Sequence, residues 1–64
     1  MFELLVSSPF DREYLVVEIW FERTMIAEIN REDGAPRIEF YIKEGQSFDL
    51  AEFLGALKKG EEKI

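Results

Sequence analysis

The chain contains neither cysteine nor histidine. Without cysteine it can form no disulfide, thiolate nucleophile or zinc–thiolate site. Without histidine it lacks the usual acid or base near neutral pH and the commonest metal ligand. It also has no glycine-rich phosphate loop, and its serines have no base partner at a recognisable spacing. We therefore predict that the protein is not an enzyme and that it holds no metal ion and no cofactor.

Long apolar runs are absent as well. No stretch approaches the roughly 20 consecutive apolar residues of a membrane-spanning helix. The first residues, M-F-E-L-L-V, place an acid where a signal peptide carries positive charge. We expect a soluble cytoplasmic protein that makes no contact with a membrane.

Basic residues are few, because 8 Lys and Arg stand against 14 Asp and Glu, a formal charge of −6. Binding to nucleic acid is driven by Lys and Arg contacts to phosphate, so we predict no direct nucleic-acid binding. An acidic protein is attracted to basic surfaces, including those that other proteins use to hold nucleic acid. A net charge of this size also keeps a small domain soluble, and both interpretations stay open.

The 64 residues, 47% of them hydrophobic, are enough for one small domain spanning 1–64. The domain is organised around Tyr14–Asn30, which reads Y-L-V-V-E-I-W-F-E-R-T-M-I-A-E-I-N. Alternating apolar residues indicate two strands that fold back at Glu22-Arg23-Thr24. We predict a β-hairpin here.

The register of this hairpin depends on the length of its loop. A three-residue loop gives one continuous apolar face through the pairs Phe21–Met25, Ile19–Ala27 and Val17–Ile29. It also sets Glu18 opposite Glu28, a like-charge pair that lowers stability. A two-residue loop avoids that pair but reverses the faces of the second strand. We predict the three-residue loop, because the buried face outweighs one repulsion.

Two further strands flank the hairpin in sequence. Phe2, Leu4 and Val6 alternate with other residues in a first strand that ends at Ser7-Ser8-Pro9, and its pairing stays open. Phe10 to Glu13 is expected to be a polar connection with one aromatic plug, Phe10. After a turn at Glu32–Ala35, in which Gly34 takes a positive φ, Arg37–Lys43 alternates regularly as the last strand.

A helix follows, beginning at the N-cap Asp49 with Glu52 completing a capping box. Phe48 and Phe53 fit a hydrophobic staple around this start. The apolar stripe of the helix consists of Leu50, Phe53, Leu54 and Leu57. We expect Gly60 to end the helix and the four residues after it to be frayed.

These elements predict a two-layer α+β fold of β-β-β-β-α order, in which three or four mostly antiparallel strands are covered on one face by the C-terminal helix. The predicted core is Leu15, Val17, Ile19, Phe21, Met25, Ala27, Ile29, Ile38, Phe40, Ile42, Leu50, Phe53, Leu54 and Leu57. The uncovered face is predicted to display Val16, Glu18, Trp20, Ile26, Glu28, Glu39 and Tyr41.

We interpret this uncovered face as a partner-binding site. Trp20 and Tyr41 belong to the residue types enriched at binding hot spots, and the three glutamates would steer a basic partner. A solvated sheet face seldom carries so many large apolar residues. The alternatives are packing beneath the segment around Phe10, or pairing of two copies as a homodimer.

Other groups of residues point to no chemistry. With so many acids, some carboxylates will always lie close together, and no pocket-forming loop accompanies them. Glu32-Asp33 and Glu61-Glu62 lack the ligand spacing of a calcium loop and indicate a turn and a tail. Stacking of nucleic-acid bases on Trp20 or Tyr41 would require flanking basic residues, where this face carries glutamates.

The segments E-Y-L-V-V-E-I-W-F-E, M-I-A-E-I-N-R-E-D-G and F-D-L-A-E-F-L-G-A-L-K-K, together with size and charge, resemble the short phage and bacterial inhibitor proteins of the anti-CRISPR class. The resemblance implies a protein that docks on a CRISPR complex or nuclease and blocks its access to DNA, often through an acidic surface. Antitoxins and immunity proteins that neutralise nucleases have the same profile. The expected partner is therefore a basic surface of a nucleic-acid-handling protein.

Overall fold

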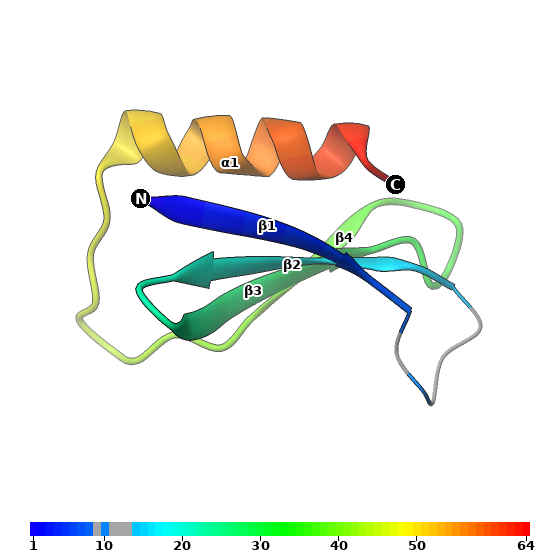
Figure 1. Ribbon diagram of the computed structural model, residues 1–64, viewed down its shortest axis with the longest axis horizontal. Helices are drawn as coiled ribbons and strands as arrows, with labels where there is room; N and C mark the ends of the chain where they lie inside the picture. Colours follow the sequence, from blue (N-terminus) through cyan, green and yellow to red (C-terminus); the bar gives the residue numbers. More distant parts are fainter. Residues whose placement is uncertain (9, 11–13) are drawn as a thin grey trace.

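The computed structural model describes residues 1–8, 10 and 14–64 of the chain. The described residues form four strands and one helix: β1 (Phe2–Ser7), β2 (Val16–Phe21), β3 (Thr24–Asn30), β4 (Arg37–Phe40) and α1 (Leu50–Glu62). The strands make one antiparallel sheet in the order β1-β2-β3-β4, and α1 lies across one face of it (Figure 1). The predicted two-layer α+β fold is confirmed, with all four strands in the sheet.

The first strand, whose pairing the sequence left open, lies antiparallel to β2. Phe2 pairs with Phe21, Leu4 with Ile19 and Val6 with Val17, so the apolar residues of β1 share the helix side of the sheet. Pro9, predicted to end this strand, and residues 11–13 of the predicted Phe10–Glu13 connection lie outside the described residues. Phe10 is fully exposed, so the prediction that it plugs the core is wrong.

The β2–β3 hairpin combines both predicted registers. Its turn has two residues, Glu22 and Arg23, with φ of 48° and 76°, the left-handed backbone of a tight hairpin turn. Thr24 therefore lies opposite Phe21, and the predicted Phe21–Met25 pair is wrong. A β-bulge between Ile19 and Trp20 then shifts the register by one residue.

Beyond this bulge the strands follow the predicted three-residue register. Ile19 lies opposite Ala27, Val17 opposite Ile29, and Glu18 opposite Glu28. Ile26 has no opposite residue on β2, and it packs in the same buried cluster as Ala27. The bulge thus reconciles a tight turn with a continuous apolar face.

The turn before β4 has the predicted form, since Gly34 takes a φ of 91° and its N–H donates to the Arg31 carbonyl at 3.0 Å. β4 is shorter than the predicted Arg37–Lys43 strand and ends at Phe40. One further ladder bond follows it, from the N–H of Tyr41 to the carbonyl of Ile26 at 2.8 Å.

Helix α1 begins as the sequence predicts. The Asp49 carboxylate accepts the Glu52 N–H at 3.0 Å, and the rings of Phe48 and Phe53 stack with centroids 5.8 Å apart. These contacts confirm the N-cap and the hydrophobic staple.

The predicted end of the helix is wrong, because α1 continues through Gly60 to Glu62. Gly60 is buried, and a Cβ added there would lie 2.6 Å from Cδ1 of Ile29. Glycine at this position therefore lets the helix approach the sheet closely. Ile64 is half-buried against the core, so the tail is not frayed as expected. No helix in the described part of the chain has the length and apolar character needed to cross a membrane.

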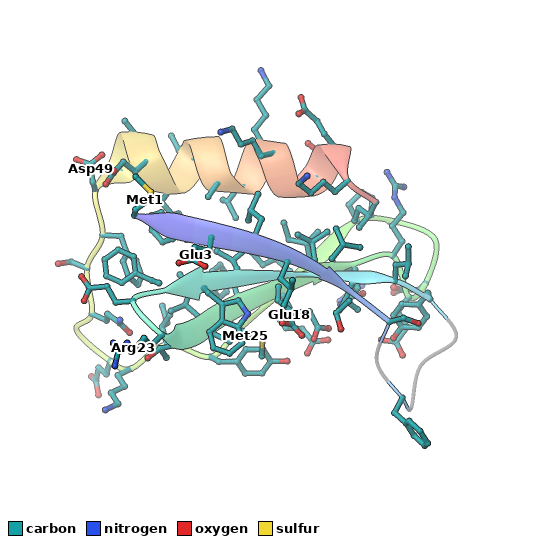
Figure 2. The ribbon with its side chains drawn as sticks, viewed as in Figure 1. Met1, Glu3, Glu18, Arg23, Met25 and Asp49 are labelled. Atoms are coloured by element: carbon teal, nitrogen blue, oxygen red, sulfur yellow. The ribbon has the colours of Figure 1, made fainter. Side chains whose placement is uncertain are left out.

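The buried centre consists of Val17, Ile19, Ile26, Ala27 and Ile29, and partly buried residues packed against it are Phe2, Leu4, Phe21, Phe48, Phe53, Leu57 and Ile64. Helix α1 contacts mainly β1 and β2. Six predicted core residues are exposed: Leu15, Ile38, Phe40, Ile42, Leu50 and Leu54. Met25, also predicted as core, lies opposite Trp20 on the side of the sheet away from α1 (Figure 2).

Candidate functional site

The face of the sheet away from α1, here called the open face, carries three glutamates in one row. Glu18 on β2 lies opposite Glu28 on β3, and Glu28 lies opposite Glu39 on β4. Neighbouring strands are about 4.8 Å apart, so the three side chains are immediate neighbours. Figure 2 shows Glu18 projecting from the sheet away from the helix. We call Glu18, Glu28 and Glu39 the glutamate row.

Both predicted aromatic anchors are attached to this row by hydrogen bonds. The indole Nε1–H of Trp20 donates to Oε1 of Glu18 at 2.9 Å. The hydroxyl of Tyr41 donates to Oε2 of Glu39 at 3.0 Å. The polar ends of the aromatic side chains thus orient carboxylates, which leaves their rings as the parts that can contact a partner.

Asn30, which the sequence did not single out, connects the row to the next turn. Its side-chain amide donates to Glu28 at 3.4 Å and to Glu39 at 3.5 Å. Its Oδ1 accepts the N–H of Glu32 at 3.1 Å, and the side chain is buried. An asparagine just before the Glu32–Gly34 turn is the signal that predicts such a side-chain-stabilised turn.

The seven predicted site residues differ in accessibility. Val16 and Ile26 are fully buried, which excludes them from direct contact with a partner, and Ile26 is buried because the bulge turns it into the core. Glu28 is only 6% exposed. Glu18 and Trp20 are half-buried, whereas Glu39 and Tyr41 are exposed.

The pairing of β1 adds residues that the sequence could not place. Glu3 lies opposite Trp20, and Leu5 lies opposite Glu18. Met25 lies opposite Trp20 on the other side, so the indole has Glu3 and Met25 as cross-strand neighbours. No local signal could have identified these neighbours, because they follow from the pairing of β1 and from the two-residue turn.

The edge of this face also carries a positively charged side chain, that of Arg37. Arg37 on β4 lies opposite Asn30, and its guanidinium forms an exposed ion pair with Asp33 at 2.9 Å. Such an exposed pair contributes at most about 1 kcal/mol. Among the residues that the structure describes, no group of acidic side chains has an arrangement suited to a metal ion.

Comparisons of the chain with protein-family models, with characterised proteins and with solved structures gave no match. The open face itself is therefore the basis for assigning a function.

Proposed function

We propose that the protein is a non-enzymatic cytoplasmic inhibitor that binds a basic surface of a nucleic-acid-handling protein. The target would be a CRISPR effector complex or another nuclease, and binding would block its access to DNA. The alignment of the glutamate row across three strands is the observation that supports this proposal. The two accessible carboxylates of the row, Glu18 and Glu39, complement the Lys and Arg side chains with which such proteins hold phosphates.

The accessible residues of the open face have two different roles in binding. Glu39 and the half-buried Glu18 supply the negative charge that steers a basic partner towards the open face. The rings of Trp20 and Tyr41 are the anchors that lose water on contact. Because hydrogen bonds already hold both carboxylates, less side-chain freedom is lost when a partner binds.

Antitoxins and immunity proteins would use the same face against a toxic nuclease. This second candidate is supported by the same glutamates, and the two differ only in the class of target. Testing both classes of purified nuclease therefore separates them.

The glutamates can be tested by removing their charge without removing their hydrogen bonds. In the double variant Glu18→Gln with Glu39→Gln, each side chain still accepts from Trp20 or Tyr41. We expect association with the target to slow about tenfold at low salt, and its salt dependence to weaken. Surface plasmon resonance on purified CRISPR effector complexes and nuclease domains measures both quantities, and a DNA-cleavage assay reports inhibition.

The matched control is Glu52→Gln with Glu62→Gln. These glutamates lie on α1, and the control removes the same amount of charge from the opposite layer. It is expected to associate at close to the wild-type rate. If both double variants associate equally slowly, net charge rather than the open face determines the association rate. Failure of the wild-type chain to bind either class of nuclease would contradict the proposal.

A further inference from the structure

The helix side of the sheet contains an apolar surface that the proposed function does not use. Ile38, Phe40 and Ile42 are 36%, 50% and 42% exposed, and on α1 the exposed fractions of Leu50 and Leu54 are 69% and 55%. Between α1 and β4 lies a groove of about 360 Å³, whose apolar lining includes Ile29, Ile38 and Leu57. Figure 1 shows β4 at the far edge of the sheet, with β1 beneath the helix.

The backbone of β4 has hydrogen-bonding groups directed towards this free edge. The bond from Tyr41 N–H to the Ile26 carbonyl identifies these residues as a hydrogen-bonded pair. Because such pairs alternate along an antiparallel ladder, Glu28–Glu39 and Asn30–Arg37 are the next ones. The N–H and C=O groups of Ile38 and Phe40 therefore point away from β3, at the edge where another strand can pair.

We propose that a second copy of this chain pairs with β4 in an antiparallel homodimer centred on Phe40. The outward-directed groups allow an axis at residue 38, 39 or 40. An axis at Glu39 would place two glutamates opposite each other, which is destabilising. An axis at Ile38 would set Pro36, which has no N–H, opposite Phe40. The axis at Phe40 instead places Ile38 opposite Ile42 of the partner copy and Glu39 opposite Tyr41 of the partner copy. This pairing extends the ladder two residues past Phe40, where β4 ends in the single chain.

The chemistry of this surface fits a second copy better than the basic target of the open face. The edge carries both signs of charge, with Arg37 and Lys43 near Glu39 and Glu44, so it offers no concentrated negative charge to a basic protein. A two-fold axis brings each apolar strip against an identical one. An ordinary interface buries about 800 Å² per partner, which is about one-sixth of the 4915 Å² surface of this chain.

The dimer has a consequence for the open face. The two-fold axis of an antiparallel strand pair is perpendicular to the sheet, so both helices lie on one side of a continuous eight-stranded sheet. Both glutamate rows then lie together on the other side. A dimer would therefore offer a basic partner two neighbouring rows without covering either one.

A cysteine scan tests the axis directly, since the chain has no cysteine of its own. Cα atoms of a hydrogen-bonded antiparallel pair are about 5.5 Å apart, within the range that a disulfide spans. We expect Phe40→Cys to form a covalent dimer under mild oxidation, detected by non-reducing electrophoresis. Ile38→Cys and Glu39→Cys should remain monomeric, because their symmetry mates are offset along the strand. Leu5→Cys, on the opposite edge strand β1, is the control. Faster cross-linking at position 38, 39 or 5 than at position 40 would overturn the proposal.

Sedimentation equilibrium tests association without covalent chemistry. The wild-type chain is expected to pass from monomer to dimer between micromolar and millimolar concentration. Phe40→Lys should weaken the dimer about tenfold or more, because two lysines would face each other across the axis. Leu5→Lys should leave it unchanged, and circular dichroism confirms that both variants are folded. A wild-type chain that is monomeric at millimolar concentration, or equal weakening by both variants, would overturn the proposal.

Salt separates this inference from the proposed function. Each copy carries a formal charge of −6, so added salt should strengthen the dimer by screening repulsion between the copies. Binding of a basic target to the open face should weaken under the same change. A dimer that weakens with salt would contradict the proposed apolar interface.

Discussion

The two halves of the helix side have similar sequence patterns but different burial. On β2, Val17 and Ile19 alternate with polar or open-face residues and are fully buried. On β4, Ile38 and Phe40 alternate in the same way, yet both remain exposed. A helix is about 10 Å wide and strands are about 4.8 Å apart, so one helix covers about two strands. The buried residues of the sheet belong to the two central strands, β2 and β3, whereas apolar residues on both edge strands, such as Val6 on β1 and Phe40 on β4, remain exposed. A central place in the sheet beneath α1, rather than the apolar alternation, therefore decides which residues form the core.

Contacts at the start of α1 hold that end over β1 and β2, and contacts at its end place it against β3. At its start, Phe48 lies 5.0 Å from Phe21 and 5.4 Å from Phe2 between ring centroids, and Phe53 lies 5.6 Å from Phe2. Towards its end, Gly60 sits against the side chain of Ile29. Phe53 also stacks on Phe40 of β4, with ring centroids 6.4 Å apart, but this single contact leaves Phe40 half exposed. The helix cannot move further over β4 without losing its contacts with Phe2 and Phe21, so the difference between the two halves is built into the packing.

The largest expected difference between the halves is in the cost of truncating an isoleucine. Ile19→Ala should lower the free energy of unfolding by about 3–4 kcal/mol, because it leaves a cavity in the closed centre. Ile38→Ala should lower it by about 1 kcal/mol or less, since the site is open to solvent. Urea unfolding at low micromolar concentration, where the chain is expected to be monomeric, measures both. Equal losses would mean that β4 is covered in solution.

The two glycines in the body of α1 provide a smaller and more local test. No described residue has an atom within 4 Å of a Cβ added at Gly55, so Gly55→Ala should stabilise the protein by about 0.5–1 kcal/mol through helix propensity. Gly60→Ala gains the same propensity but forces a methyl group against Ile29, and overpacking typically costs about 1–3 kcal/mol. We expect Gly60→Ala to lower the free energy of unfolding by about 1 kcal/mol, measured by thermal unfolding. Stabilisation by both substitutions would contradict the close approach of α1 to β3.

Features determined by neighbouring residues could be predicted from the sequence. The Asp49 cap, the Phe48–Phe53 staple and the Gly34 turn depend on residues a few positions apart, and the structure contains all three. The end of the helix could not be predicted, because Gly60 is needed for contact with β3 rather than for a cap. Local patterns do not show which distant element a residue approaches.

The candidate site could also be predicted only in part. Glu18, Glu28 and Glu39 share a row because the predicted register holds through the middle of the sheet. The loss of Ile26 from the open face follows from a bulge, and the bulge follows from a two-residue turn that contains neither glycine nor asparagine. Such a turn has no sequence signal, so the side on which Ile26 lies could not be predicted.

The smallest expected effect concerns two leucines on adjacent sides of α1. Leu54 is 55% exposed towards the uncovered half, so Leu54→Gln should change the free energy of unfolding of the monomer by less than about 0.5 kcal/mol. Leu57 packs against the core, and Leu57→Gln should destabilise by about 1–2 kcal/mol through lost apolar burial. Chemical unfolding at two protein concentrations sharpens the comparison. If a second copy covers β4, dimerisation should stabilise the folded wild-type chain more than the Leu54→Gln variant. The free energy of unfolding lost in this variant should then rise with protein concentration. If Leu54→Gln and Leu57→Gln lower the free energy of unfolding equally in dilute solution, the helix side of the monomer is closed over β4.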